Sequence, residues 1–252
     1  MHDDTLIAAF TEQAETFAAS AVANAAQTLD ELVALAAPRP SERWLDAACG
    51  PGIVTRRLAP LVREAHGVDL TPAMVDEAQR ETARAGLANV TFAVGDATAT
   101  GAAAASFDGA VTRFSIHHLP LPIRLVEELA RVVRSGGAIV LADHVADEDP
   151  RAAAWSQEIE RLRDPSHWAC LSPPGLRELG RRAGLALEEE RLAAIELDFD
   201  DWLRRGTTDP AAHALVERAL TERPEGAECF AVEPHDGRRV LRLRLWTARW
   251  RR

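Results

Sequence analysis

The chain has 252 residues, of which 47% are hydrophobic and 27% charged, as is typical of a globular protein with a sizeable core. Its formal net charge of −10 argues against a broad electrostatic interaction with nucleic acid. The three cysteines are far apart, at Cys49, Cys170 and Cys229, which argues against a disulfide framework or a CxxC zinc site.

The N-terminal region is predicted to be helical. Apolar residues within 5–36 recur with helical spacing, and the segment PRPSE at 38–42 then ends the pattern. The first ten residues are acidic, unlike a signal peptide, and no apolar run in the chain approaches the ~18 residues of a membrane span. We therefore expect a cytoplasmic protein without membrane contacts.

From residue 43 onwards, short apolar runs alternate with amphipathic segments. This alternation is typical of βαβ units, and it predicts an α/β doubly wound fold whose ligands bind at the carboxyl ends of parallel strands. We expect strands near residues 43–48, 64–69, 90–94, 108–113 and 137–143, with helices near 53–61, 72–85 and 122–133.

The pattern changes after residue 150. Here we expect helices near 151–162, 174–183 and 210–222 around a strand near 185–197. The last segment, AVEPHDGRRVLRLRLW, places the turn pair Asp236-Gly237 before alternating apolar and arginine residues, which predicts a β-hairpin. The final strand would pair with a second copy if it lay at a sheet edge, so a monomer and a homodimer are both compatible with the sequence.

The first predicted strand runs into the glycine-containing turn LDAACGPG. A dinucleotide fingerprint has three glycines, and its first and third would fall at Ala48 and Thr55, where they are missing. Gly50 and Gly52 remain, and Asp46 precedes them as an acceptor for an ammonium group. This set fits a ligand that has no pyrophosphate, such as S-adenosylmethionine.

Two further acids end the next two predicted strands. Asp69 lies 23 residues after Asp46, close to the ~20 residues expected between a nucleotide-binding turn and the acid that binds ribose. Asp96, in FAVGDAT, would contact an adenine amino group. Each acid alone is as compatible with capping the following turn as with binding, and the combined pattern favours binding.

Five motifs in order, LDAACGPG, GVDLTPAMVDEA, VGDAT, SFDGAVTRFSIHHL and RVVRSGGAIVLAD, resemble those of the S-adenosylmethionine-dependent class I methyltransferases. The resemblance covers residues 41–145 and is greatest to the small-molecule branch that includes the ubiquinone and menaquinone biosynthesis enzymes. It implies a Rossmann-like, mostly parallel, seven-stranded sheet in a single domain over 1–252. Residues 1–40 would form a helical lid, 41–145 the cofactor-binding core, and 146–252 a substrate cover with the C-terminal hairpin.

The resemblance also implies the cofactor contacts. Asp46, Gly50 and Gly52 would surround the methionine portion, and Asp69 would bind the ribose hydroxyls. Ala48 lies in the same turn, where many members have glycine. Further contacts, to the adenine or beside the sulfonium, are implied for Leu70, Met74, Asp96, Ala97, Arg113 and Phe114.

Three histidines follow the fourth and fifth predicted strands, at His117, His118 and His144. Imidazole titrates near neutral pH, so each is a candidate general base for an acceptor that loses a proton. The alternative for each is packing beneath the site. No metal-ligand cluster is visible in the sequence, and we expect no metal.

Aromatic and polar residues outside the core motifs are candidates for substrate contact. Phe10, Gln13 and Phe17 share one side of the predicted N-terminal helix, which would cover the cofactor or form a plain core face. The segments DPSHW and FDDWL lie in the predicted cover, where aromatic walls suit a flat or apolar acceptor. Their candidates are His167, Trp168 and Trp202, with core packing or helix capping as the alternative.

These features predict methyl transfer from S-adenosylmethionine to oxygen, nitrogen or carbon of a small molecule, in biosynthetic or secondary metabolism. The alternative is an S-adenosylmethionine-binding enzyme of the same fold that catalyses a cyclisation or rearrangement, because function belongs to the site and not the fold. A nucleic-acid partner is disfavoured, since the arginines of the last strand alternate as on a solvent-facing strand.

Overall fold

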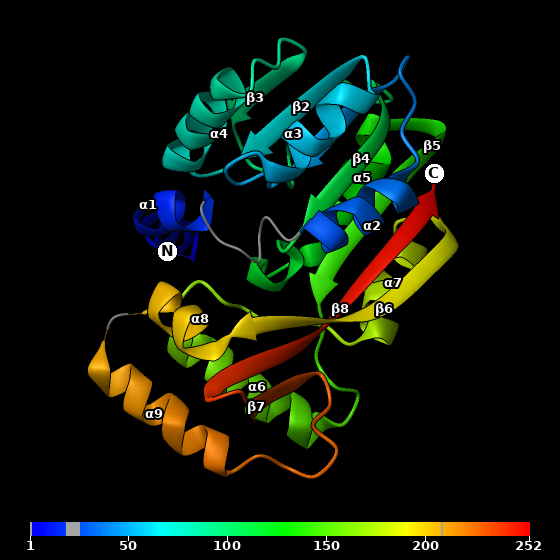
Figure 1. The fold of residues 1–252 in the computed structure, drawn as a ribbon. Helices are drawn as coiled ribbons and strands as arrows, with labels where there is room; N and C mark the ends of the chain where they lie inside the picture. Colours follow the sequence, from blue (N-terminus) through cyan, green and yellow to red (C-terminus); the bar gives the residue numbers. More distant parts are fainter. Residues whose placement is uncertain (1, 19–25, 208) are drawn as a thin grey trace.

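A central sheet organises the fold (Figure 1). The structure is a computed structural model that describes residues 2–18, 26–207 and 209–252, with side chains from 2–12, 28–207 and 209–252. The strands are β1 (Arg43–Ala47), β2 (Glu64–Asp69), β3 (Val90–Val94), β4 (Phe107–Arg113), β5 (Val133–His144), β6 (Ala186–Asp198), β7 (Phe230–His235) and β8 (Arg238–Arg251). The helices are α1 (His2–Ala18), α2 (Ala26–Ala36), α3 (Ile53–Leu58), α4 (Pro72–Arg84), α5 (Pro122–Val132), α6 (Pro150–Arg163), α7 (Pro173–Arg182), α8 (Phe199–Gly206), α9 (Pro210–Thr221) and the 3-10 turns η1 (Ala59–Leu61) and η2 (Ile116–His118).

Within the described residues the sheet has eight strands. Seven follow the order β3-β2-β1-β4-β5-β8-β6, and β7 pairs with β8. The strands from β3 to β5 are parallel, whereas β8 runs antiparallel to β5 and β6. This confirms the mostly parallel α/β sheet, with one strand more than predicted because β7 extends it. The sheet-edge position considered for the final strand is wrong, since β8 is flanked on both sides.

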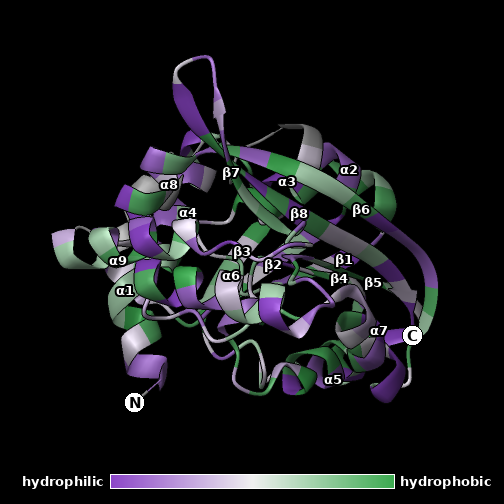
Figure 2. Cartoon of the chain, turned by 90° about the horizontal axis from the view of Figure 1, so that it is seen from below, coloured by the Kyte–Doolittle hydropathy of each residue, from purple (hydrophilic) through white to green (hydrophobic). Residues whose placement is uncertain are grey.

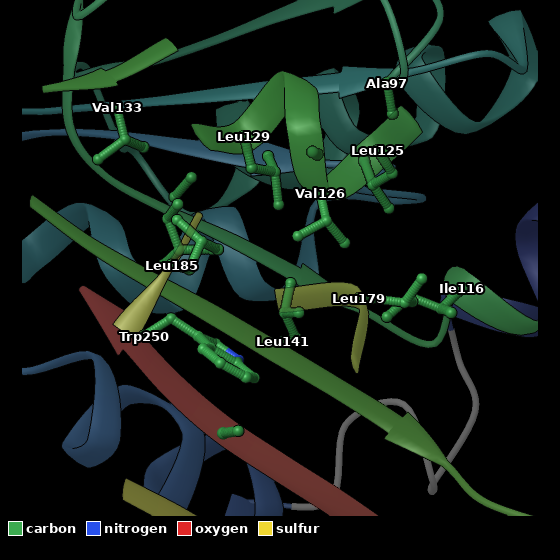
Figure 3. Close-up of a cluster of buried hydrophobic side chains, with 14 of the residues drawn as sticks. Ala97, Ile116, Leu125, Val126, Leu129, Val133, Leu141, Leu179, Leu185 and Trp250 are labelled. Carbon is green, nitrogen blue, oxygen red and sulfur yellow. The ribbon is translucent and has the colours of Figure 1, made fainter. Parts of the chain in front are cut away.

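Neighbouring residues of the central strands face opposite sides of the sheet, as the two-residue period of a strand requires. Leu45 and Leu141 lie in a core cluster with side chains of α5 and α7, shown in Figure 3. Trp44 and Val140 lie in a second cluster with side chains of α2 and α3. Burial on both faces explains the continuous apolar runs that predicted these strands.

The antiparallel strands β6 and β8 extend beyond the parallel sheet (Figure 1). Residues 245–251 of β8 pair with β5, while 238–243 pair with β7. Side chains of α6, α8 and α9 pack against this outer part in a third core cluster. The predicted hairpin turn is confirmed at Asp236 (φ 48°) and Gly237 (φ 76°), and Figure 2 shows its hydrophilic tip projecting from the molecule.

Several predicted boundaries shift in the structure. The helical pattern of 5–36 comprises α1 and α2, and that of 53–61 divides into α3 and η1. β5 begins at Val133 rather than 137, because Gly136 (φ 74°) and the irregular β4–β5 register allow the strand to continue through the glycine pair. α8 was not predicted as a helix; it begins after Asp198, whose side chain accepts a hydrogen bond from the Asp201 amide at 2.8 Å. Among the described helices, none has the length and apolar character to cross a membrane.

Candidate active site

A pocket opens at the carboxyl ends of the parallel strands, where a doubly wound sheet binds its ligands. It holds about 950 Å³ of empty space, counted to its open mouth, and α1 contributes Leu6 and Phe10 to its wall. Every predicted cofactor residue except Gly52 lines it, namely Asp46, Ala48, Gly50, Asp69, Leu70, Met74, Asp96, Ala97, Arg113 and Phe114.

The turn after β1 places three residues in the left-handed backbone region: Ala48 (φ 56°), Gly50 (φ 52°) and Gly52 (φ 74°). Gly52 is required for packing, because a Cβ there would lie 2.8 Å from the ring of Phe92. Ala48 occupies this region at a cost of about 1–2 kcal/mol relative to a right-handed conformation. Alanine is thus accommodated at the position where glycine was expected, with backbone strain.

Asp46 is buried beneath the turn. The Oγ1 of Thr55 donates a hydrogen bond to Asp46 Oδ2 at 2.6 Å. Burial raises the pKa of Asp46 to about 7, and the hydrogen bond from Thr55 opposes this rise. Thr55 occupies the place of the third dinucleotide glycine, so the residue that breaks that fingerprint holds the acid in position. The missing glycine is visible in the sequence, whereas this role of Thr55 is visible only in the structure.

Asp69 joins the end of β2 to the glycine turn. Its Oδ2 accepts a hydrogen bond from the Gly50 amide at 2.7 Å, and its Oδ1 accepts one from the Thr71 amide at 2.9 Å. Burial raises the pKa of Asp69, and these hydrogen bonds oppose the rise. Each carboxylate oxygen retains a second acceptor site for a ribose hydroxyl.

Asp96 follows β3, where it caps a turn and is also part of the pocket lining. Its Oδ1 accepts a hydrogen bond from the Thr98 amide at 2.7 Å, which caps the turn. It also lines the pocket, beside the buried Ala97. On this wall Leu70 and Met74 provide an apolar surface between the two acids.

β4 ends at Arg113, and the next residue, Phe114, has a φ of 55°, which is rare for a bulky side chain. The Arg113 guanidinium lies 4.4 Å from the centre of the Phe114 ring. Burial lowers the pKa of Arg113 to about 10, which leaves the group charged at neutral pH. The strained residue places an aromatic wall and a cation together at the pocket.

Of the three histidines predicted as bases, His118 lines the pocket. Its Nδ1 lies 3.1 Å from the backbone oxygen of Ser166, an acceptor, so Nδ1 carries the proton and Nε2 has the free lone pair. The Ser166 hydroxyl donates to Asp164 Oδ1 at 2.6 Å, which holds this segment in place. Burial lowers the pKa of His118, so its imidazole is neutral near pH 7.

His117 and His144 are absent from the described lining of this pocket and lie behind it. His117 Nδ1 donates to Asp143 Oδ1 at 2.6 Å, and burial lowers the pKa of His117 to about 4. The backbone amide of His144 donates to the same carboxylate at 2.8 Å. Burial alone would raise the pKa of Asp143, but its histidine partners hold it well below the usual range. The structure therefore places these two candidates in a buried polar network.

The predicted substrate residues separate into different environments. Phe10 lines the pocket, and its ring centre lies 5.0 Å from that of His118. The side chains of Gln13 and Phe17 lie outside the part of the chain whose side chains are described. Whether they contact a substrate stays a prediction.

The cover residues also differ. His167 is buried, and its Nε2 lies 2.6 Å from Gln157 Oε1. Trp168 is half exposed, and its ring centre lies 5.2 Å from that of His2 on α1. Trp202 is not brought to the pocket; it packs in the third core cluster, with Arg163 over its ring. Helix α8 buries its apolar side against β6 and β8, which explains why Trp202 packs in the core and does not line the pocket.

Sequence reasoning missed several polar partners in this region. Asp143 had a detectable signal, because it directly precedes His144 at a strand end. Asp164 and Ser166 lie in the DPSHW segment, for which only His167 and Trp168 were predicted as site residues. Glu160 had no sequence signal, since it lies on the buried side of α6 among residues of ordinary helical character.

The donor set fits S-adenosylmethionine. Three carboxyl groups, those of Asp46, Asp69 and Asp96, face the pocket beside the single guanidinium of Arg113 among its described lining. Such an acidic lining favours a ligand that carries a sulfonium and an ammonium group. The apolar wall between Asp69 and Asp96 suits an adenine ring.

The comparisons with known proteins agree with this geometry. The family described as "Methyltransferase domain" matches residues 45–141. The uncharacterized methyltransferase YcgJ of Bacillus subtilis is 31% identical over 199 residues, which cover 79% of each chain. The crystal structure of YcgJ superposes with a TM-score of 0.84 at 27% identity, over 90% of this chain and 98% of that one.

Two further proteins are similar over less of their length or at lower identity. The aklanonic acid methyltransferase DauC of Streptomyces sp. (strain C5) is 33% identical over 117 residues, or 45% of this chain and 53% of DauC. The crystal structure of the cyclase SpnF shares the fold, with a TM-score of 0.64 at 20% identity over 90% of this chain and 80% of SpnF.

Together the sheet, the pocket and these matches define an S-adenosylmethionine-dependent class I methyltransferase. The chain belongs to the methyltransferase family that includes YcgJ, and its cofactor is S-adenosylmethionine.

Proposed function

We propose that the enzyme methylates a flat or apolar small molecule whose accepting oxygen or carbon carries a proton, in biosynthetic or secondary metabolism, with His118 as general base. One observation carries the proposal: among the three predicted histidines, His118 is the one in the pocket lining, with Nε2 left as a proton acceptor. A base is needed where the acceptor is protonated at neutral pH, as in a phenol, an alcohol or an enol.

The surroundings of His118 support an acceptor of this kind. Leu6, Phe10, Phe114 and Leu119 are apolar members of the pocket lining, and the Phe10 ring contacts His118 edge-on. Aromatic walls with few polar groups suit a flat or apolar ligand. The similarity to DauC, an aklanonic acid methyltransferase, also supports a small-molecule acceptor.

S-adenosylmethionine, when bound, supplies a methyl group that the sulfonium has already activated. The protein's residues hold the acceptor in line, which can supply ~7–11 kcal/mol of the barrier reduction. His118 Nε2 takes the acceptor's proton while Nδ1–H stays bonded to Ser166. Asp164, in the same segment as Ser166, favours the imidazolium that forms. Proton transfer of this kind contributes typically about 10²–10⁴-fold in rate.

The test begins with calorimetry of S-adenosylmethionine and S-adenosylhomocysteine on the purified protein, where both are expected to bind. A panel of phenols, enols, alcohols and neutral amines is then incubated with protein and cofactor, and products are identified by mass. We expect CH₂ addition to flat, proton-bearing acceptors. Methylation confined to amines contradicts the proposal, and products of unchanged mass support the cyclisation or rearrangement alternative.

A further inference from the structure

Behind the pocket wall, three histidines from separate segments come together: His117 of η2, His144 at the end of β5, and His167 after α6. One ring nitrogen from each lies within 4.8 Å of the others. The centre of the His117 ring is 4.3 Å from that of His144 and 5.6 Å from that of His167. His117 and His167 are buried, and the His144 side chain is 11% exposed.

Hydrogen bonds leave two of these rings with a free nitrogen. His117 gives its Nδ1 proton to Asp143, so its Nε2 has the lone pair. Gln157 is oriented by the backbone of Cys170, whose amide donates to Oε1 at 3.0 Å and whose carbonyl accepts from Nε2 at 2.9 Å. The Gln157 oxygen therefore accepts from His167 Nε2 at 2.6 Å, which leaves His167 Nδ1 free. A carboxylate or amide oxygen bonded to the second nitrogen is the usual arrangement around a metal-binding histidine.

A second observation is that His144 lies between two carboxylates at long distances. His144 Nδ1 lies 3.3 Å from Asp143 Oδ1, and His144 Nε2 lies 3.5 Å from Glu160 Oε1. Neither His144 Nε2 nor Glu160 Oε1 makes a contact of hydrogen-bond geometry, so this ion pair is loose. This loosely paired imidazole and carboxylate, in a cluster with two further imidazoles that each have an unprotonated nitrogen, indicate a site for a cation.

We propose that His117, His144 and His167 bind one divalent transition-metal ion of the zinc or iron(II) class, with Glu160 beside it. Imidazole nitrogen is a preferred ligand of these ions, and three histidines suffice to hold zinc. Nitrogens bound to one tetrahedral ion at ~2.1 Å are ~3.4 Å apart, so the ring nitrogens need to approach one another by up to about 1.4 Å. The carboxylates of Asp143 and Glu160 would balance the charge of the ion.

A metal ion at this position would link separate segments of the chain. It would connect η2, β5 and the DPSHW segment, with α6 beside them, directly behind the acceptor side of the pocket. The ring centre of His117 lies 4.0 Å from that of the proposed base His118. In the metal-free alternative, a proton on His144 bridges Asp143 and Glu160, and the cluster is a structural hydrogen-bond network.

Metal binding by the full-length wild-type protein distinguishes a metal site from a metal-free hydrogen-bond network. The protein is stripped with a chelator, dialysed, and titrated with Zn²⁺ by calorimetry and with Co²⁺ by visible absorption. We expect one equivalent of each ion and the absorption bands of nitrogen-ligated Co²⁺. Binding well below one equivalent, or a spectrum identical to that of hydrated Co²⁺, would overturn the proposal.

Matched variants assign the site. His167→Ala should abolish the Co²⁺ bands, and Glu160→Gln should weaken Zn²⁺ binding by about 10–100-fold. His235→Ala is the control, because it removes an exposed histidine on the hairpin, and it should bind as the wild type does. Circular dichroism checks folding, and His144→Gln replaces any variant that fails to fold. Equal binding by the wild type and the folded cluster variants contradicts the site, and none of these readouts requires methyl transfer.

Discussion

The two halves of the proposed active site, one for the cofactor and one for the acceptor, are assembled in different ways. The cofactor half takes Asp46, Asp69 and Asp96 from the ends of three neighbouring parallel strands, and the glycine turn adds local backbone contacts. The acceptor half holds His118 through Ser166, a residue 48 positions away in the sequence. One half therefore depends on short motifs and strand order, and the other on long-range packing of α6 and the segment that follows it.

Both halves contain a residue with a strained backbone and a buried acid. Each half has a non-glycine residue with a left-handed backbone at a strand end, Ala48 after β1 and Phe114 after β4. In each half a buried acid faces a polar partner, Asp46 with Thr55 and Asp143 with His117. Such strained and buried groups persist only where the surrounding fold holds them, as is common at functional sites.

The largest effect should come from the acceptor half. His118→Gln removes the proposed base while retaining a polar side chain, so kcat should fall by about 10²–10⁴-fold. Affinity for S-adenosylmethionine should change little, because the cofactor half is untouched. Steady-state kinetics with an acceptor from the panel and calorimetry measure the two quantities. His213→Gln on α9 is the control, and an unchanged kcat in His118→Gln would remove this histidine as the base.

The next effect concerns the cofactor half. Asp69→Ala removes the predicted ribose acceptor and leaves the Gly50 amide without its partner, so affinity for S-adenosylmethionine should fall by about 1–3 kcal/mol. Calorimetry measures the change. Asp76→Ala, at an exposed position on α4, should bind normally. Wild-type affinity in Asp69→Ala would refute the ribose contact.

The third prediction concerns the pH dependence of cofactor affinity, which also tests the cofactor half. The pKa of Asp46 is about 7 because of burial, so the acid is increasingly protonated below pH 7. A cationic ammonium favours the carboxylate, so cofactor affinity should be level above pH 7 and fall by about tenfold per unit below it. Calorimetry from acidic to neutral pH tests this. Asp46→Asn should bind weakly with a flatter profile, and an equally steep profile in that variant would assign the titration elsewhere.

The smallest effect is on stability. Ala48→Gly relieves left-handed strain of about 1–2 kcal/mol, offset by the ~0.5–1 kcal/mol entropic cost of glycine, so a net gain of up to about 1.5 kcal/mol is expected. Chemical denaturation measures it. Ala47→Gly, one residue earlier in the buried strand β1, should destabilise the protein instead. A loss of stability in Ala48→Gly would show that the turn bears no strain there.

The sequence by itself determined the parallel part of the fold and most of the cofactor pocket. Strand and helix periodicity depend on residues within a few positions, and the carboxyl ends of parallel strands necessarily lie at one edge of the sheet. This is why the acids at 46, 69 and 96 were recognised as one group. The same local reasoning located the hairpin turn at Asp236-Gly237.

Only the tertiary structure decided the acceptor half. His117 and His118 are adjacent in the sequence, yet one faces the buried network and the other the pocket. His167 joins His117 and His144 because the segment after α6 hydrogen-bonds to the backbone of η2, where the Trp168 amide donates to the His117 carbonyl at 2.9 Å. Trp202 packs in the core against side chains of the long strands β6 and β8. These outcomes depend on contacts between residues tens of positions apart, which no local pattern encodes.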